Sequence, residues 1–177
     1  MATQKSAEEI LEEARKFIGA ETKPRRARYP VESDPIRRFC HMTNDDNPLF
    51  LDPEYAKKSR FGDVIAPMTA VSLMTGNGIW PLAPDTGERL PTVPTLGDRA
   101  INLTTEWEFL KPVKVGDHLS TSHRFADVYI KPIRLDPKAF WTVTEEVVRN
   151  QDGEEVAIYR NIGLSHRAPE EVAADQG

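Results

Sequence analysis

The apolar and charged positions divide the chain into segments of different character, and one long segment carries no charge. Residues 64–84 contain no charged residue, although charged residues make up 29% of the sequence. Pro67 stands where the first residue of a helix would stand, and Gly76 and Gly78 stand where that helix would end. The pattern predicts a buried central helix. Prolines and glycines interrupt the segment too often for a membrane span, which needs about 20 mainly apolar residues.

Apolar and polar residues alternate from residue 99 onward, which is the period of a strand with one buried face. The alternation predicts four long strands, at residues 100–110, 118–130, 140–150 and 154–166. The turn signal Q-D-G at residues 151–153 predicts a hairpin between the last two. Strands of about twice the usual length predict a strongly curved antiparallel sheet, and the uncharged helix is the segment expected in its concave face.

An amphipathic helix is predicted at the amino terminus. Ser6 and Glu9 form a capping-box pattern, and apolar residues then recur at helical spacing until Gly19. The apolar stripe must pack on the domain's own sheet or on a second chain, and the sequence leaves both open. An extended segment is expected at residues 28–31, followed by helices that begin near Asp34 and Asp52, each of which precedes a proline.

Together these elements predict an α+β protein with the layout of the hot-dog fold. In that layout a long curved antiparallel sheet is wrapped around a buried central helix, here with an extra N-terminal helix. We divide the chain into an amphipathic helix at residues 1–19, a single hot-dog domain at residues 20–166 and a tail at residues 167–177. The composition of the tail is typical of disorder. The total length of 177 residues suits one domain with a substantial core.

Charge and cysteine content narrow the function classes. The net charge of −5, without a basic block, argues against nucleic acid as the main partner. The basic run K-P-R-R-A-R at residues 23–28 either meets the phosphates of a cofactor or is a solvated loop face. The single cysteine, Cys40, excludes an internal disulfide, and the charged amino terminus lacks the apolar stretch of a signal peptide. We therefore expect a cytoplasmic protein that is not bound to a membrane.

The remaining reactive side chains do not form an obvious site of their own. No histidine is spaced from another histidine or from the cysteine as a metal ligand would be, so no metal site is expected. His118 and His123 are an odd number of residues apart on one predicted strand, which places them on opposite faces. Cys40 lies in an apolar helical phase and is interpreted as a core residue, in preference to a nucleophile.

Three segments carry a family resemblance: D-D-N-P-L-F-L-D at residues 45–52, F-G-D-V-I-A-P-M at residues 61–68 and F-L-K-P-V-K-V-G-D at residues 109–117. In combination they resemble the MaoC-like (R)-specific enoyl-CoA hydratases and dehydratases of the hot-dog superfamily. The segment K-P-R-R-A-R-Y-P-V at residues 23–31 is similar to the amino-terminal MaoC dehydratase branch. That branch includes histidine-lacking subunits of heteromeric hydratases. The resemblance implies an acyl-CoA thioester as substrate and no further cofactor.

The resemblance assigns roles to the polar loop at residues 44–47 and to the residues after it. Active members of the family carry an aspartate in this loop and a histidine five residues later. The aspartate position is Asp45, the family's asparagine and proline fall on Asn47 and Pro48, and the histidine position is Phe50. Asp45 and Asn47 are therefore the candidate catalytic residues. A phenyl ring at Phe50 can neither accept nor donate the proton that hydration of an enoyl thioester requires.

The start of the central helix is the expected site for the thioester oxygen, because backbone N–H groups there can stabilise enolate charge. Pro67 removes one of these donors. His41, four residues before Asp45, is an alternative acid if the chain bends between them. Nine residues either line an acyl pocket or belong to the core, and these are the candidate substrate-binding residues: Phe50, Val64, Ile65, Ala66, Pro67, Met68, Thr69, Val71 and Met74.

Three functions remain open. The first is a subunit of a heteromeric (R)-specific enoyl-CoA hydratase for a bulky or long acyl thioester, such as a steroid side chain. In this hypothesis a partner MaoC-like chain supplies the Asp and His pair. The second is a self-sufficient homodimeric hydratase or thioesterase that uses Asp45. The third is a non-catalytic acyl-CoA-binding protein. Phe50 favours the first and third over the second, and all three predict binding of a CoA thioester.

Overall fold

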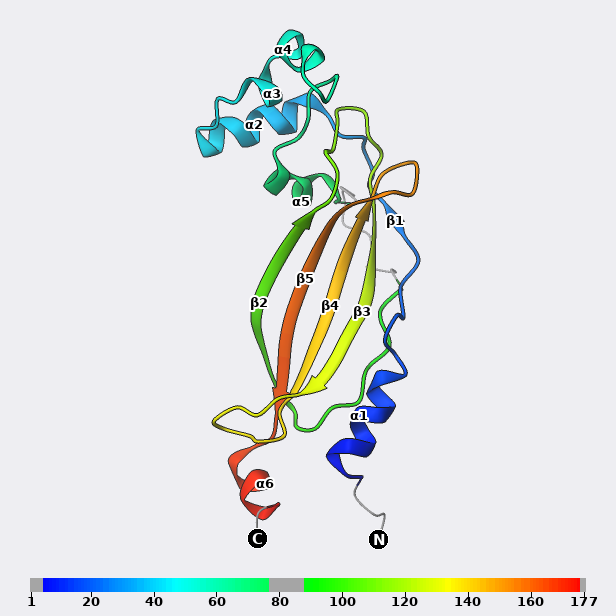
Figure 1. The fold of residues 1–177 in the computed structure, drawn as a ribbon, viewed down its shortest axis with the longest axis vertical. Coiled ribbons are helices and arrows are strands. Elements are labelled where there is room, and N and C mark those ends of the chain that lie inside the picture. The colour runs from blue at the N-terminus through cyan, green and yellow to red at the C-terminus, as the bar shows by residue number, and fades with distance from the viewer. Residues whose placement is uncertain (1–4, 77–87, 176–177) are drawn as a thin grey trace.

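A five-stranded antiparallel sheet runs along most of the molecule in the computed structural model, which describes residues 5–76 and 88–175 (Figure 1). The strands are β1 (Arg25–Arg26), β2 (Arg99–Phe109), β3 (Ser120–Ile130), β4 (Phe140–Arg149) and β5 (Glu155–His166). Their order across the sheet is β1-β3-β4-β5-β2, so β2 lies at one edge. The predicted α+β fold with long antiparallel strands is confirmed.

The four predicted strands correspond to β2, β3, β4 and β5, and the ends differ by at most about two residues. The predicted hairpin joins β4 to β5, where the N–H of Asn150 donates to the carbonyl of Glu154 at 3.0 Å. The extended segment near the amino terminus is displaced from the predicted residues 28–31. It forms β1, in which Arg25 pairs with Thr121 and Arg26 with Ser120. Two residues are too few to produce a readable alternation.

Helix α1 (Ala7–Arg15) begins with the predicted capping box. The N–H of Glu9 donates to Ser6 Oγ at 3.2 Å, and the N–H of Ser6 donates to the Glu9 carboxylate at 2.7 Å. The buried side of α1 packs in one apolar cluster with Phe125 of β3 and Phe140 of β4. The apolar stripe of this helix therefore lies on the domain's own sheet, which decides between the two alternatives that the sequence leaves open.

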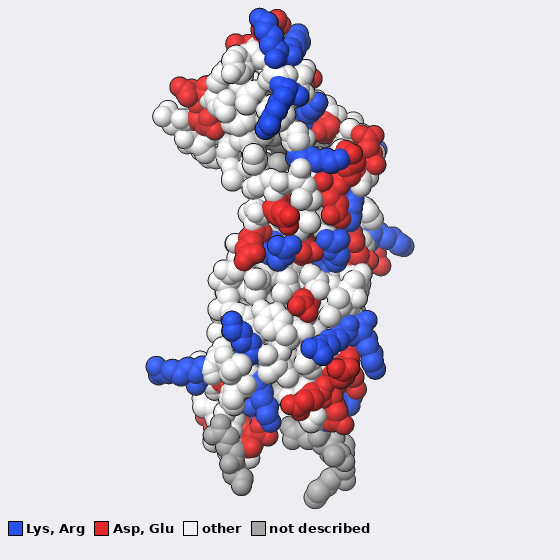
Figure 2. Space-filling model, viewed as in Figure 1, with Lys and Arg blue, Asp and Glu red and all other residues white. Residues whose placement is uncertain are grey.

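The two faces of the sheet differ in character. We call the face that carries Phe125 and Phe140 the inner face, and the opposite one the charged face. Figure 2 shows a band of acidic and basic side chains across the sheet. On the charged face, Glu145 is bound at 2.8 Å by both Arg124 and Arg160. Burial alone would raise the pKa of Glu145, but the hydrogen bonds from the two arginines outweigh it and lower that pKa.

Three helices gather at the end of the molecule opposite α1: α2 (Ser33–Thr43), α3 (Pro48–Leu51) and α4 (Pro53–Lys58) (Figure 1). Asp52 caps α4 as predicted, with its carboxylate accepting from the N–H groups of Glu54 and Tyr55. Asp34 is not the cap of α2 but lies in its first turn. Buried side chains of these helices join Leu119, Val148 and Val156 of the sheet end in a second apolar cluster.

The central helix is shorter within the described residues than the sequence predicts. It consists of a 3₁₀ turn, η1 (Met68–Ala70), followed by α5 (Val71–Met74), and lies near the end of β2 (Figure 1). Residues before Pro67 are held extended, because Ile65 pairs with Lys114 and the N–H of Ala66 donates to Val113 at 2.8 Å. Residues 77–87, which include the predicted helix end at Gly78, lie outside the described residues.

The carboxyl-terminal segment is ordered where its composition predicts disorder. Pro169–Ala174 forms a helix, α6, and Arg167 is buried just before it. Asp136, which has no exposed surface, accepts hydrogen bonds from the backbone N–H and from the guanidinium of Arg167. This contact spans residues distant in the sequence, so local composition could not reveal it. None of the helices in the described residues is long and apolar enough to cross a membrane.

Candidate active site

The polar loop between α2 and α3 uses its side chains to fix its own backbone. Asn44 ends α2 in the left-handed conformation, at φ 54°. Asp45 Oδ1 accepts the N–H of Asn47 at 3.1 Å, and Asn47 Oδ1 accepts the N–H of Leu49 at 3.1 Å, which caps α3. The two candidate catalytic residues therefore lie together in the loop. Each has one side-chain oxygen engaged in holding the loop shape.

Phe50 lies one turn into the short helix that follows the loop. It is half-buried and packs against the apolar cluster that contains Ile36 and Cys40. The aromatic ring is thus part of the packing beneath the loop. Burial, with a smaller contribution from the charge of Asp45, raises the pKa of the Cys40 thiol, which agrees with a core role for this residue.

The loop is connected directly to the segment that leads into the short central helix. The carbonyl of Leu49 accepts the N–H of Ile65 at 3.3 Å, and the N–H of Ala66 is bonded to Val113. Pro67 has no N–H. The first amides that can point out of the helix start are therefore those of Met68 and Thr69, where no intrahelical acceptor exists. The number of candidate oxyanion donors is reduced accordingly.

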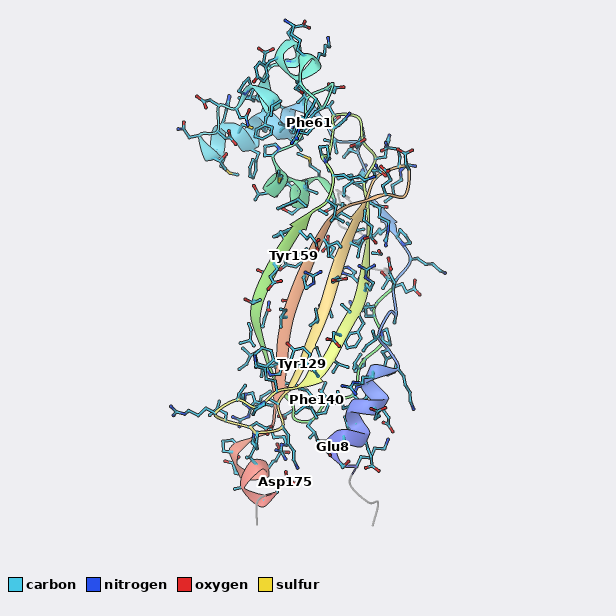
Figure 3. The ribbon with its side chains drawn as sticks, viewed as in Figure 1. Glu8, Phe61, Tyr129, Phe140, Tyr159 and Asp175 are labelled. Carbon is cyan, nitrogen blue, oxygen red and sulfur yellow. The ribbon has the colours of Figure 1, made fainter. Side chains whose placement is uncertain are left out.

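A small apolar cavity, which we call the acyl cavity, lies beside this helix start. Its volume is about 160 Å³, and it is lined by four of the predicted substrate-binding residues, namely Ile65, Ala66, Met68 and Val71. The opposite wall comes from the end of β2 and the residues after it, Phe109 to Val113, together with Arg60 and Phe61. Figure 3 shows Phe61 at the end of the molecule that carries α2 to α4.

The other predicted substrate-binding residues have different surroundings. Val64 and Met74 are buried in the second apolar cluster, as is expected of core residues. Pro67 is buried and Thr69 is exposed. The wall from Phe109 to Val113 was not predicted as part of a site. The signal for it was present in the F-L-K-P-V-K-V-G-D segment, which the resemblance had singled out only as a family motif.

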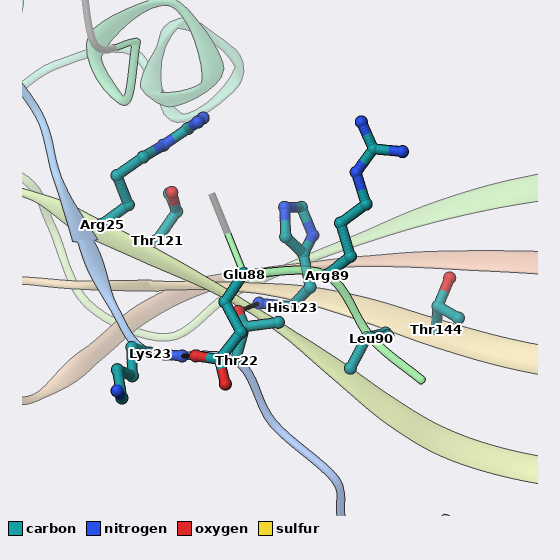
Figure 4. A pocket seen from close by; sticks show the side chains of 9 residues that line it. All are labelled: Thr22, Lys23, Arg25, Glu88, Arg89, Leu90, Thr121, His123 and Thr144. Atoms are coloured by element: carbon teal, nitrogen blue, oxygen red, sulfur yellow. Dashed lines mark hydrogen bonds between the residues drawn. The ribbon is translucent and has the colours of Figure 1, made fainter. Parts of the chain in front are cut away.

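A second pocket, of about 310 Å³, contains part of the basic run that the sequence analysis singled out. Lys23 and Arg25 line it together with Arg89, and Figure 4 shows Arg25, His123 and Arg89 projecting to the same side of the sheet. Glu88 at its rim accepts the backbone N–H of Lys23 at 2.9 Å. The pocket is open to solvent and has a positive character that suits an anionic group.

The histidines do not complete an acid–base pair with the loop. His41 is exposed on the surface of α2, where its Nδ1 lies 3.5 Å from Arg37 Nη1. His166 is buried, and its Nδ1 is 2.9 Å from the carbonyl of Arg167. Throughout residues 5–76 and 88–175, no hydrogen bond joins a histidine to Asp45, and no group of His, Cys, Asp or Glu side chains has a metal-binding arrangement.

Comparison with known sequences gives a consistent picture. A family model described as "FAS1-like, dehydratase domain region" matches residues 16–159. A UPF0336 protein of Streptomyces avermitilis is 32% identical over 97 residues, which cover 53% of this chain and 59% of that protein. A probable enoyl-CoA hydratase alpha subunit of Thermomonospora curvata is 28% identical over 144 residues, 77% of this chain and 45% of that protein. The alignments thus span less than two thirds of the length of either relative.

Comparison with solved structures gives the fold. A chain of the ChsH1-ChsH2 complex from Mycobacterium tuberculosis matches with a TM-score of 0.64 at 21% identity, over 92% of this chain and 93% of that chain. A chain of the C-terminally truncated HadBC complex, a 3R-hydroxyacyl-ACP dehydratase from the same organism, matches with a TM-score of 0.55 at 19% identity. That match covers 84% of this chain and 97% of that chain. Both similarities extend over nearly the whole sheet and its helices.

Proposed function

Because the chain belongs to the FAS1-like dehydratase family of MaoC-like hot-dog proteins, we propose that it is a subunit of an (R)-specific enoyl-CoA hydratase. In this proposal it forms one half of a shared active site, and a second MaoC-like chain supplies the Asp and His pair. The observation that carries the proposal is Phe50. The resemblance assigns it the family's histidine position, and its ring packs against the apolar cluster instead of offering a proton-transfer group beside Asp45.

The chemistry of hydration explains why this observation matters. Water attacks the β-carbon of the enoyl thioester while a base takes its proton, and a proton is then delivered to the α-carbon. Asp45 alone could hold a water molecule, but its Oδ1 already accepts the N–H of Asn47. Loss of one acid–base group typically lowers the rate by about 10²- to 10⁴-fold. The complete pair must then come from another chain if the reaction is to be fast.

The role left to this chain is to bind the acyl thioester. The amides of Met68 and Thr69 would donate to the thioester oxygen, and the acyl cavity would take the first carbons of the acyl group. Two methionines, Met68 and Met74, lie in or beside this region and can adapt to a bulky group such as a steroid side chain. Similarity to chains from the ChsH1-ChsH2 and HadBC complexes supports an assembly of two different chains.

The test is hydration of a trans-2-enoyl-CoA by the purified chain, alone and with candidate MaoC-like chains from the same genome. We expect turnover by the chain alone to be at least about 100-fold below that of the complex. Asp45→Ala should leave the activity of the complex within about threefold of the wild type, as should the matched control Asp46→Ala at the exposed neighbouring position. Thermal unfolding of both variants would confirm that the loop remains folded.

Two outcomes would contradict this proposal in different ways. Robust turnover by the chain alone, abolished by Asp45→Ala, would identify a self-sufficient hydratase or thioesterase and direct attention to His41. Thioester binding without turnover in any combination of chains would identify a non-catalytic acyl-CoA-binding protein. The variant Phe50→His separates these cases further. It would restore measurable turnover to the chain alone only if the rest of the site is built for catalysis.

A further inference from the structure

The inner face of the sheet contains a further cavity, far from the polar loop, which we call the distal cavity. Its volume is about 370 Å³. The side chains that give it its polar character are Thr95, Asn102, Thr142, Asn161 and Ser165, and Gly163 lies among them. No charged side chain of residues 5–76 or 88–175 lines it. The cavity therefore suits a neutral polar group and is poorly suited to a phosphate or a carboxylate.

Two of the residues that line this cavity each have a side-chain atom that is buried without a hydrogen-bond partner. These atoms are Asn161 Oδ1 and Ser165 Oγ, and among the side chains of the described residues no other nitrogen or oxygen is buried in this condition. Buried polar groups in folded proteins are nearly always hydrogen-bonded, because leaving one unpaired is unfavourable. An amide oxygen accepts only, and a hydroxyl can donate or accept. The missing partner of Asn161 is therefore a donor.

The distal cavity and the acyl cavity lie along the same strand. Asn102 of β2 lines the first and Phe109 of β2 lines the second, and at ~3.3 Å per residue they are about 23 Å apart. Between them Trp107 stacks on Phe109 with ring centroids 5.6 Å apart and contacts Tyr159 at 4.9 Å. Figure 3 shows Tyr159 between the end that carries Phe61 and the end that carries Phe140. An aromatic surface thus connects the two cavities.

We propose that the distal cavity binds a neutral hydrogen-bond donor, a hydroxyl or an amide N–H, at the far end of the thioester whose carbonyl lies at the acyl cavity. This inference rests on the proposed function and extends it by naming a substrate feature. The part of an acyl-CoA that reaches this distance from the thioester carbonyl is the far end of a long acyl group, because both amides of the pantetheine arm lie only a few bonds from that carbonyl. Asn161 and Ser165 are the binding residues for this donor.

Calorimetric titration of the chain, in the oligomer in which it purifies, tests this with saturated probes that cannot react. The probes are hexadecanoyl-CoA, 16-hydroxyhexadecanoyl-CoA and coenzyme A. If the acyl hydroxyl is bound, the hydroxylated thioester binds about tenfold more tightly than the plain one, and Asn161→Leu removes the difference. If Asn161→Leu instead weakens all three probes by a similar factor, the distal cavity does not bind the acyl hydroxyl and the inference is refuted. Ser165→Ala, a nearly isosteric change, should act in the same direction.

Controls separate the failure of this inference from the failure of the proposed function. Thr104→Val changes an exposed residue of β2 that pairs with Ile162 on the charged face, away from both cavities, and should leave all three affinities unchanged. If the wild type binds both thioesters but neither cavity variant alters any affinity, the distal site is refuted and thioester binding stands. If the wild type binds no thioester, the proposed function fails as well.

The stability of the unliganded protein provides an independent readout. Because Ser165→Ala removes a buried hydroxyl that has no partner, we expect its melting temperature to be unchanged or raised. The same holds for Asn161→Leu if the larger apolar side chain fits the cavity. A clear fall in melting temperature for Ser165→Ala would show that the hydroxyl serves the fold, and would overturn its assignment as a binding group.

Discussion

Among the ion pairs of the described residues, the pair of Asp136 and Arg167 is the most completely buried. Arg167 donates its backbone N–H, Nε and Nη2 to the carboxylate, at 2.9, 3.1 and 2.7 Å, and Lys138 donates a further backbone N–H. The hydrogen bonds from the Arg167 guanidinium hold the pKa of Asp136 far below its ordinary value, despite the opposing effect of burial. The pair fixes the chain just before α6.

We expect Asp136→Asn to lower the free energy of unfolding by about 3 kcal/mol at pH 7, since it leaves the buried Arg167 guanidinium with only the more exposed carboxylate of Asp175, at 2.9 Å, as its counter-charge. The depressed pKa of Asp136 stabilises the wild type fully above the unfolded-state pKa, about 3.9, and this contribution is lost as pH falls toward the folded-state pKa. The difference between wild type and variant should therefore shrink below about pH 4. Denaturant unfolding at pH 7, 4 and 3 measures it, and a constant difference would contradict the prediction.

The backbone of Gly97 lies so close to the backbone of His166 and Arg167 that there is no room for a side chain. Its φ is +78°, and a Cβ built on it would lie 2.2 Å from the carbonyl carbon of His166. We expect Gly97→Ala to destabilise the protein by at least about 2 kcal/mol, since backbone strain and a clash with backbone atoms combine. Gly153→Ala is the matched control. It has the same φ with no atom within 4 Å, and should cost only about 1 kcal/mol. Equal melting temperatures of the two variants would refute the role of the close approach.

At the scale of the element, β2 is an 11-residue strand that pairs on one side only, with β5, among the described strands. Its residues are exposed except at the Phe109 end, and the apolar side chains of Ile101, Leu103 and Trp107 are between 36% and 45% exposed. A long exposed edge with apolar side chains is a surface that tends to pair with another strand. We therefore expect the chain to associate through this edge.

The prediction can be tested at Leu103, which lies at a bulge and has no partner in the register between β2 and β5. Leu103→Lys should weaken association of the purified chain by at least about tenfold while leaving its melting temperature within a few degrees of the wild type. Leu135→Lys, at an exposed leucine away from β2, is the control. Sedimentation velocity over a range of concentrations measures the effect. A monomeric wild type, or equal weakening by both variants, would count against the edge.

At the scale of the whole molecule, the elements that the sequence predicted well are those whose signal is local. The alternation in β2 to β5 and the capping box of Ser6 are examples. The central helix is a further example, since it begins at Met68, next to the predicted Pro67, and its described part ends at Met74, shortly before Gly76. The order around Arg167 was missed because its signal is not local: its partner Asp136 is 31 residues away.

The candidate site shows the same division between local and distant information. Ile65, Ala66, Met68 and Val71 were predicted either to line an acyl pocket or to belong to the core, and the structure places them in the wall of a cavity whose ligand stays a prediction. The facing wall from Phe109 onward could not be assigned to it, because that segment is brought beside the helix start by contacts between residues distant in the sequence, the pairing of Ile65 with Lys114 and the bond from Ala66 to Val113. Asp45, Asn47 and Phe50 were placed by family resemblance, and their catalytic or supporting roles remain predictions for the hydration assay.

The position of β2 in the sheet also determines when the protein can finish folding. Its only neighbour among the described strands is β5, so Arg99 pairs with His166, which the ribosome adds much later. Until β5 has been synthesised, β2 has no strand to pair with, and Leu103 and Trp107 stay accessible to other nascent chains. Long-range pairing of this kind slows folding and prolongs exposure to aggregation. Co-translational capture by chaperones should therefore be greatest while residues between β2 and β5 are emerging.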